Sequence, residues 1–308
     1  MTKRDCVSVL DIEAELKKIL DDAINLKAGW ARGEREKPLA GKSMAMIFEK
    51  PSTRTRVSFE VGMAQLGGYA LNLARADIQL GRGETITDTA RVLSRYVDII
   101  MYRAFDHNMV SDLAKNATIP VINGLDNLEH PCQTLADLMT ILEHKKGFEG
   151  KKLAYIGDGN NVCNSLLLGA AVVGMDMSAI CPEEYKPDEK IYKKALEIAS
   201  TNNCKIDLTS VPEKGVENAD IIYTDTWISM GDDADAEARN KAFQPYQVNT
   251  ELVSAAKDDY IFMHCLPAHR NSEVTDEVMD GENSVIFDQA ENRLHAQKAL
   301  ILFLLEAK

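Results

Sequence analysis

Short apolar runs alternate with segments whose apolar residues recur at helical spacing, from residue 42 to the end of the chain. This alternation is typical of β-α-β units, in which helices cover a parallel sheet. The pattern therefore predicts an α/β protein with parallel sheets flanked by helices. Four expected strands come early and six come late: Met44–Phe48, Ala70–Leu73, Asp98–Tyr102 and Ile119–Ile122, then Leu153–Ile156, Met177–Ile180, Lys205–Leu208, Ile221–Thr224, Tyr260–His264 and Ser284–Phe287.

The two groups of strands predict two domains, which fits 308 residues at roughly 150 per domain. Between the groups, Pro131–Lys146 has Pro at its first helical position and stops at Gly147, which predicts a bridging helix. The last segment, Gln289–Ala307, has helical spacing and is expected to pack back on the body. The expected domains are 1–130 completed by helix 289–308, an interdomain helix over 131–146, and 147–288.

The charge balance narrows the class of partner. The chain has 48 acidic residues against 35 Lys and Arg, a net charge of −13, and 45% hydrophobic residues. A negative field disfavours nucleic acid and anionic membranes as partners. An anionic substrate would therefore need a local cluster of arginines.

Several sequence features bear on the compartment. The longest apolar run, 299–305, is shorter than the roughly 20 residues that span a bilayer, and residues 1–10 lack the pattern of a secretory leader. The six cysteines form no Cys-x-x-Cys pair, so neither a disulfide framework nor a zinc knuckle is expected. We therefore expect a cytoplasmic protein.

The first chemical motif follows the strand Met44–Phe48. There the chain enters Ser52-Thr53-Arg54-Thr55-Arg56 and then a helical pattern that ends at Gly67-Gly68. Hydroxyls and unpaired N–H groups at a helix start bind phosphate, and an arginine can hold two phosphate oxygens at once. The alternative is an N-capped helix with solvated arginines, but two arginines among three hydroxyls favour phosphate binding.

Two further candidates lie between this motif and the bridging helix. Arg103 comes at the carboxyl end of a predicted strand, where ligands bind in open α/β sheets, although it could also be a surface arginine. His130 directly precedes the bridging helix, whose dipole favours a neutral imidazole that can donate to a carbonyl oxygen. The alternative for His130 is a simple helix cap.

Two motifs in the second half suit a small polar ligand. Gly157-Asp158-Gly159-Asn160-Asn161 matches only the first two glycines of a dinucleotide fingerprint, because Val162 replaces the third, and no nicotinamide cofactor is expected. Asp225-Thr226-Trp227-Ile228-Ser229-Met230-Gly231 follows a predicted strand and offers a carboxylate that suits an ammonium group.

His264-Cys265-Leu266-Pro267-Ala268-His269 follows another predicted strand. Metal ligation by His264, Cys265 and His269 is conceivable, but strand alternation would point neighbouring side chains to opposite faces, so no physiological metal is expected. Cys265 as a covalent nucleophile is a minority interpretation, because the sequence shows no evident histidine–carboxylate relay around it.

Taken together, the run Ser52–Arg56, then His130-Pro131-Cys132-Gln133, then His264-Cys265-Leu266-Pro267 resembles the transcarbamylase family, in order and over essentially the whole chain. Asp225 with Ser229-Met230-Gly231, and Cys265-Leu266-Pro267, are similar to its ornithine branch rather than to the aspartate branch. The resemblance implies transfer of a carbamoyl group from carbamoyl phosphate to the δ-amine of L-ornithine, giving L-citrulline and phosphate.

The resemblance also implies two α/β domains with the active site in the cleft between them, and no metal or organic cofactor. It assigns the phosphate to Ser52, Thr53, Arg54, Thr55 and Arg103, with Gln79 reaching in from the neighbouring subunit of a homotrimer or a multiple of trimers. It assigns catalytic roles to Arg103, His130, Gln133 and Cys265.

For the substrates, the resemblance implies that Arg103, His130 and Thr55 bind the carbamoyl oxygen. Gln133 and the carbonyl of Leu266 would bind the carbamoyl NH₂. Arg293 would lie near the carbamoyl phosphate end, and Cys265 would lie at the carbamoyl site near the side-chain amine of ornithine. The ornithine α-groups would be fixed by Asn161, Asp225, Ser229 and Met230, and the segment Ser229–Asp235 would close over ornithine.

Two alternatives stay open. The acceptor could be putrescine or an N-acylated ornithine, or aspartate, although Ser229-Met230-Gly231 argues against these. A non-catalytic amino acid sensor on the same fold would bind ligands without releasing phosphate. The sequence does not distinguish citrulline synthesis in arginine metabolism from the reverse reaction.

Overall fold

The computed structural model describes residues 3–80, 83–228 and 236–306. The chain forms two compact units, one of residues 1–139 with 291–308 and one of residues 140–290. The boundaries fall inside two long helices, α5 (Pro131–Lys145) and α12 (Ile286–Leu304). The first unit is therefore discontinuous in sequence, because the end of α12 completes it.

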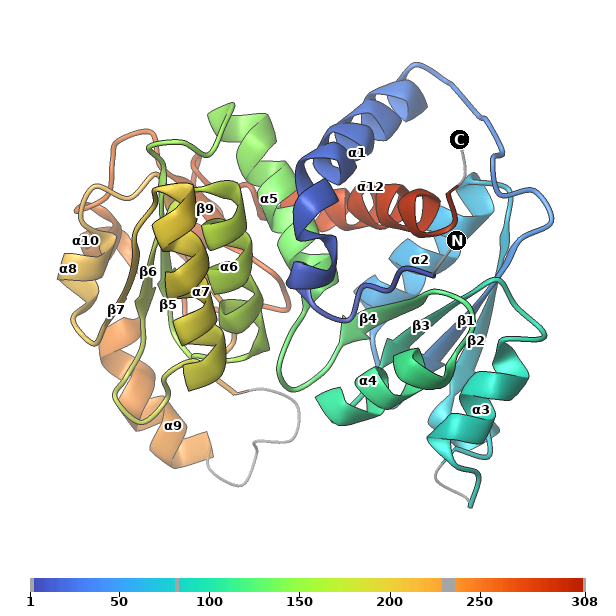
Figure 1. Ribbon diagram of the computed structural model, residues 1–308. Coiled ribbons are helices and arrows are strands. Elements are labelled where there is room, and N and C mark those ends of the chain that lie inside the picture. Colours follow the sequence, from blue (N-terminus) through green and yellow to red (C-terminus); the bar gives the residue numbers. More distant parts are fainter. Residues whose placement is uncertain (1–2, 81–82, 229–235, 307–308) are drawn as a thin grey trace. The chain divides into compact units, whose positions relative to one another are not determined.

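The first unit is built on a parallel sheet of four strands in the order β2-β1-β3-β4, counted over the described residues (Figure 1). The strands are β1 (Ser43–Phe48), β2 (Tyr69–Ala74), β3 (Ile99–Arg103) and β4 (Val121–Leu125). Besides parts of α5 and α12, its helices are η1 (Val9–Glu15), α1 (Leu16–Ala31), α2 (Thr53–Gln65), η2 (Arg75–Asp77), α3 (Ile86–Leu93) and α4 (His107–Asn116).

Alternation along the strands gives the first sheet two buried faces. Ala45 and Ile47 of β1 pack in a cluster with Ala90 of α3 and Val110 of α4. The alternate residues of β1, such as Met44, are also fully buried, and α1, α2 and α12 lie on that side (Figure 1). Burial on both faces is what a parallel sheet requires.

The second unit has a parallel sheet in the order β7-β6-β5-β8-β9. The strands are β5 (Lys152–Ile156), β6 (Asp176–Ile180), β7 (Ile206–Thr209), β8 (Ile221–Thr224) and β9 (Ile261–His264). The helices are α6 (Asn161–Val173), α7 (Glu189–Asn202), α8 (Pro212–Val216), α9 (Ala236–Phe243), η4 (Gln244–Tyr246), α10 (Thr250–Val253) and α11 (Asp276–Met279). Its core joins Ile156 and Phe262 of the sheet to Val216 of α8 and Val253 of α10.

In each sheet the order of the strands reverses once, and a ligand site is expected at that point. In the first sheet the order reverses between β1 and β3, and in the second between β5 and β8. Ligands of open α/β sheets bind outside the carboxyl ends of the strands at such a switch point. The segments after β1, β3, β5 and β8 are therefore the candidates in this chain.

The predicted α/β class with parallel sheets is confirmed, but one predicted strand is wrong. Ser284–Phe287 makes a single bridge, between Ser284 and Phe262, and Ile286 already begins α12. The backbone N–H of Val285 donates to Phe262 O over 3.0 Å, so the chain touches the sheet edge and then turns into a helix. A short apolar run does not distinguish a buried strand from the start of a buried helix.

Several large apolar side chains of the first unit are exposed to solvent. Val57 and Val61 of α2 are 53% and 39% exposed, and Tyr69 and Leu71 of the edge strand β2 are 63% and 38% exposed. The helix predicted after Ser52–Arg56 is present as α2, but its buried face carries Phe59 rather than Val57 and Val61.

Among the described helices, none is both long and apolar enough to cross a membrane.

Candidate active site

The Ser-Thr-Arg-Thr-Arg run opens α2 at the switch point of the first sheet. Ser52 has extended backbone and caps the helix, because its Oγ accepts from the backbone N–H of Thr55 over 3.3 Å. Thr53 and Arg54 occupy the first turn, with Thr53 exposed and Arg54 partly buried. The helix start thus presents the hydroxyls and N–H groups that the sequence indicated as a phosphate site.

Two arginines from distant parts of the chain converge on Thr55. Arg103, the last residue of β3, donates from Nη1 to Thr55 Oγ1 over 3.3 Å. Arg293 of α12 donates from Nη2 to the same oxygen over 3.2 Å, and from Nη1 to Gln133 Oε1 over 2.6 Å. Gln133 in turn donates from Nε2 to Asp137 Oδ1 over 2.8 Å. These five side chains form one connected donor cluster within the first unit.

The cluster leaves Thr55 with a defined role. A hydroxyl accepts two hydrogen bonds and donates one. Because Arg103 and Arg293 use both acceptor positions of Oγ1, the hydroxyl hydrogen is what Thr55 can offer to a ligand. Arg103 and Arg293 are only 6% and 3% exposed, so their charges act where water screens them little.

His130 lies beside this cluster in its neutral form. Burial lowers the pKa of His130 well below the ordinary value of 6.5, and the cations Arg293, Arg103 and Arg54 lower it further. The sequence predicted a neutral imidazole from the helix dipole, and here burial is the larger cause. A neutral imidazole in this place can donate to an oxygen that gains negative charge.

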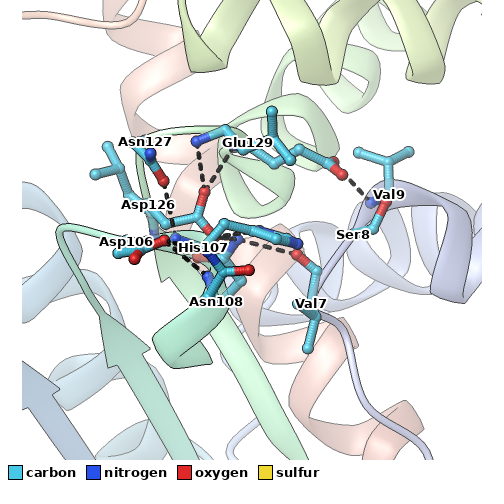
Figure 2. A network of polar contacts seen from close by, with 12 residues as sticks. Val7, Ser8, Val9, Asp106, His107, Asn108, Asp126, Asn127 and Glu129 are labelled. Atoms are coloured by element: carbon cyan, nitrogen blue, oxygen red, sulfur yellow. Dashed lines mark hydrogen bonds and ion pairs between the residues drawn. The ribbon is translucent and has the colours of Figure 1, made fainter. Parts of the chain in front are cut away.

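A network of polar contacts fixes the loop that leads to His130 (Figure 2). Asp126, fully buried, accepts from the backbone N–H groups of Leu128 and Glu129 over 2.8 Å each, and from Asn123 Nδ2 over 2.8 Å. Glu129 Oε2 accepts from the N–H of Val9 over 3.1 Å. The loop is therefore tied to β4 and to the start of η1.

His107, at the start of α4, closes this network. Its Nδ1 lies 2.7 Å from Asp126 Oδ2, and its backbone N–H donates to Asn127 Oδ1 over 2.8 Å (Figure 2). The hydrogen bond with Asp126 raises the pKa of His107 above 6.5 against the effect of partial burial. A protonated His107 supplies a positive charge next to the buried carboxylate.

In the second unit, Asp225 directly follows β8, at the point where the order of the strands reverses. Its Oδ2 accepts from Asn160 Nδ2 over 2.8 Å, and its Oδ1 accepts from the backbone N–H of Thr226 over 2.8 Å. Asn160 is the N-cap of α6 and precedes Asn161, the first residue of that helix. The polar residues after β5 and β8 thus meet, as their places in the sheet require.

Cys265 also reaches Asp225, a contact with a carboxylate that was not evident from the sequence. Cys265 Sγ lies 2.9 Å from Asp225 Oδ1. The strands explain this contact, because β8 and β9 are parallel neighbours with Thr224 opposite His264, so the next residues of both strands lie side by side. Sequence alone could not give this strand order.

The His-Cys motif forms the one cluster of metal-type ligand atoms in residues 3–80, 83–228 and 236–306. Atoms of Asp225, His264 and Cys265 lie within 4.8 Å of one another, although strand alternation predicted that His264 and Cys265 diverge. His264 is engaged otherwise, since Nδ1 accepts from the N–H of Leu266 over 2.9 Å and Nε2 lies 3.3 Å from Glu273. Both ring nitrogens are committed to the protein, which does not fit a metal ligand.

Leu266 has a backbone conformation that marks it as special. Its φ is 58°, in the left-handed region that favours glycine. Such strain in a branched residue persists where the surroundings impose it, often at functional sites. The residues that surround Leu266 therefore hold its backbone in this left-handed conformation.

The glycines after β5 have a structural reason. Gly157 has a φ of 137°, and a Cβ at Gly159 would lie 2.2 Å from the backbone nitrogen of Pro187. Both positions need glycine whether or not a dinucleotide binds nearby. The partial fingerprint is therefore no sign of a nucleotide site.

Among the described residues, Gln79 is a predicted site residue that is not brought into these clusters. Gln79 is exposed on the segment before Leu80. Ser229 and Met230, and with them the predicted closing segment Ser229–Asp235, lie outside the described residues. Conversely, no role was predicted for Asp137, His107 or Asp126. For Asp137 a signal existed, because it lies one helical turn after Gln133.

The two-unit α/β protein has a cluster of arginines at one switch point, which suits an anion, and an oriented carboxylate at the other, which suits a cationic group. The comparisons agree with this class. Residues 4–143 match the model of the aspartate/ornithine carbamoyltransferase carbamoyl-P binding domain, and residues 149–304 match that of the Asp/Orn binding domain. The chain belongs to the aspartate/ornithine carbamoyltransferase family.

Similar proteins narrow the branch. The chain is 58% identical over 300 residues to the ornithine carbamoyltransferase of Methanobrevibacter smithii, covering 97% of this chain and 99% of the relative. It is similar to the structure of ornithine carbamoyltransferase from Pyrococcus furiosus, with TM-score 0.95, 56% identity, and 98% and 96% of the two chains covered. For the anabolic enzyme of Campylobacter jejuni the TM-score is 0.91, the identity 39%, and the coverage 98% of both chains.

Proposed function

We propose that the chain transfers the carbamoyl group of carbamoyl phosphate to the δ-amine of L-ornithine, giving L-citrulline and phosphate, as a step of arginine synthesis. The family and the names of its close relatives support this function. The observation that carries it is the pair of buried arginines that meet on Thr55 Oγ1 and aim its hydroxyl hydrogen at a ligand.

In this proposal, the first unit binds carbamoyl phosphate. The helix start at Ser52, Thr53 and Arg54 holds the phosphate, as does Arg103, and Gln79 contributes from a neighbouring subunit. Thr55, Arg103 and His130 donate to the carbamoyl oxygen. Gln133, with the Leu266 carbonyl, accepts from the carbamoyl NH₂, and Arg293 and Cys265 lie near this group.

The second unit binds ornithine. Asp225 pairs with the α-ammonium group, and Asn161, Ser229 and Met230 hold the remaining α-groups. The link between Asp225 and Cys265 supports this assignment, because it holds one carboxylate oxygen in a fixed place beside the thiol. A fixed acceptor orients a flexible amino acid better than a mobile one.

The chemistry requires what these residues offer. The δ-amine attacks in its neutral form, although an alkyl amine of this kind has a pKa of about 10.4, and desolvation beside cations lowers it. A nitrogen–carbon bond forms, the bond from carbon to the phosphate oxygen breaks, and the proton lost by the amine nitrogen goes to the departing phosphate. Negative charge gathers first on the carbamoyl oxygen, where Thr55, Arg103 and His130 donate, and then on phosphate, where the helix start and Arg54 stabilise it. Positioning and electrostatics supply the catalysis.

We also propose a homotrimer, or a multiple of trimers. The exposed apolar side chains of Val57 and Val61 on α2 and of Tyr69 and Leu71 on the edge strand β2 support an interface between copies. An exposed edge strand with large apolar residues needs cover. Sedimentation equilibrium tests this state, since a monomer at micromolar concentration would refute it.

A cytoplasmic location fits the cysteine chemistry. All six cysteines are free, and four of them are buried. Free thiols in this number are typical of proteins from a reducing compartment.

The function is tested by supplying L-ornithine, putrescine, N-acetylornithine or L-aspartate in turn with carbamoyl phosphate and measuring phosphate release and product mass. The proposal predicts phosphate and citrulline with L-ornithine alone. Activity with another amine would keep the phosphate site and overturn the assignment of Asp225. Ligand binding without phosphate release would favour the sensor.

A further inference from the structure

Asn160 joins the start of α6 to the carboxylate at the end of β8. Its side-chain oxygen caps the helix, accepting from the N–H groups of Val162 and Cys163 over 2.9 and 3.2 Å. Its side-chain nitrogen donates to Asp225 Oδ2 over 2.8 Å. From the sequence, Asn160 was expected to belong, with Asn161, to a motif that suits a small polar ligand. One side chain here spans the switch point of the sheet.

The orientation of the Asn160 amide is fixed by its surroundings. The oxygen accepts from two N–H groups at the start of α6. The hydroxyl of Tyr155 lies 3.2 Å from it and shares its one hydrogen between this oxygen and the carbonyl oxygen of Asp158, which is 2.9 Å away. Tyr155 is fully buried, and burial raises the pKa of its hydroxyl well above 10, so the hydroxyl stays protonated and remains a donor. With its oxygen held in this way, the amide must turn its NH₂ group toward Asp225.

The bonds to Asp225 leave one direction for a ligand. Each carboxylate oxygen has two lone pairs. Oδ1 accepts from the N–H of Thr226 and from Cys265 Sγ, whereas in the described part of the chain Oδ2 accepts from Asn160. A further donor, such as an ammonium hydrogen, is therefore directed to Oδ2, the oxygen that Asn160 holds.

We propose that Asn160 is a positioning residue that holds Asp225 Oδ2 ready for the ammonium group of the amino acid substrate. The inference rests on the proposed function, because it takes ornithine as that substrate. Asn160 acts through Asp225 and need not touch the ligand. Since its oxygen also caps α6, the orientation of Asp225 is set by the rigid helix start rather than by a loop.

The test separates positioning from helix capping. Asn160→Ser keeps a good cap, because serine caps helices about as well as asparagine, but its side chain is too short to donate to Asp225. The matched control is Asn249→Ser, which makes the same change at the N-cap of α10 in the same unit. Asn160→Thr is a second capping variant that lacks the amide donor.

We expect Asn160→Ser and Asn160→Thr to raise the KM for L-ornithine about 10- to 100-fold, the usual effect of losing a hydrogen bond to a charged group. The KM for carbamoyl phosphate and the midpoint of thermal unfolding should match those of Asn249→Ser. An unchanged KM for ornithine, or equal rises for both substrates, would overturn the proposal.

The rate of Cys265 alkylation by iodoacetamide, followed by mass spectrometry without substrates, gives a readout independent of activity. Cys204, also partly buried, is the internal reference. Once Asp225 is no longer held, Cys265 should be alkylated faster in Asn160→Ser than in the wild type, because its contact with the carboxylate weakens. An unchanged ratio of the two rates would contradict the proposal. If the wild type made no citrulline, the proposed function would fail, but this ratio would still test the Asn160–Asp225 link.

Discussion

Arg293 and Thr55 are 238 positions apart in the chain, yet Arg293 Nη2 donates to Thr55 Oγ1 over 3.2 Å. The contact lies within one unit, because residues 291–308 return to the unit that contains α2. The C-terminal helix therefore contributes a side chain to the proposed carbamoyl phosphate site. This relationship makes the end of the chain part of the proposed catalytic apparatus.

The first prediction concerns the two hydrogen bonds that Arg293 donates, one to Thr55 and one to Gln133. Arg293→Lys keeps the charge but cannot reach Thr55 and Gln133 together. We expect kcat/KM for carbamoyl phosphate to fall about 100-fold, as when one preorganised donor is lost. Arg95→Lys, at an exposed arginine of the same unit, is the control and should leave steady-state kinetics unchanged. A loss below about threefold in Arg293→Lys would count against the cluster.

Arg54→Ala tests the helix start itself. The variant loses a donor to the phosphate, but α2 keeps its cap from Ser52. We expect a rise of about tenfold or more in the KM for carbamoyl phosphate and a lower kcat, with little change in the urea midpoint of unfolding. Unchanged kinetics of the purified variant would sink the phosphate assignment.

Asp225→Asn tests the ammonium partner. An amide has the shape of the carboxylate but no charge, so the α-ammonium loses its counter-ion. We expect ornithine affinity, measured by calorimetry in the presence of carbamoyl phosphate, to fall about 10- to 100-fold. Equal affinity in both proteins would show that ornithine binds elsewhere.

His107 gives a prediction for pH. The pKa of His107 is raised in the folded state, chiefly by its hydrogen bond with Asp126, while Glu129 and Asp106 also raise it. The stability it contributes is therefore fully present below the unfolded pKa of about 6.5 and is lost as pH rises through the folded pKa. In urea unfolding, the difference between wild type and His107→Gln should shrink from pH 6 toward pH 9.

The control for this titration is His144→Gln, which removes another imidazole–carboxylate contact, 3.0 Å from Asp288. A difference for His107→Gln that stays constant across the pH range would contradict the role of its charge. A difference that grew with pH would also contradict it, because a raised pKa requires the stabilisation to fall as the pH rises.

Much of the fold could be predicted from the sequence, because the spacing of apolar residues indicates which residues of a helix or strand are buried. The strand predicted at Ile221–Thr224 is matched residue for residue by β8, whereas Ser284–Phe287 is wrong because its apolar run serves the start of a helix. Apolar spacing on α2 predicted the helix but not its buried side, since Val57 and Val61 are exposed.

The candidate site, too, could be predicted only in part. Residues in local motifs, such as Ser52–Thr55, could be identified because a helix start has a sequence signature. The contact of Cys265 with Asp225 depends on the order of strands β8 and β9, which no local pattern encodes. The role of Asp126, in the loop after β4, was missed for the same reason, because its partner His107 lies 19 residues earlier in the chain, at the start of α4.

The central claim is tested most directly by the stoichiometry of the reaction. Purified protein is incubated with carbamoyl phosphate and L-ornithine, and phosphate and citrulline are measured in the same sample against a sample without protein. The account predicts one citrulline for each phosphate released above the background. Phosphate release without citrulline, or no release above background, would contradict it.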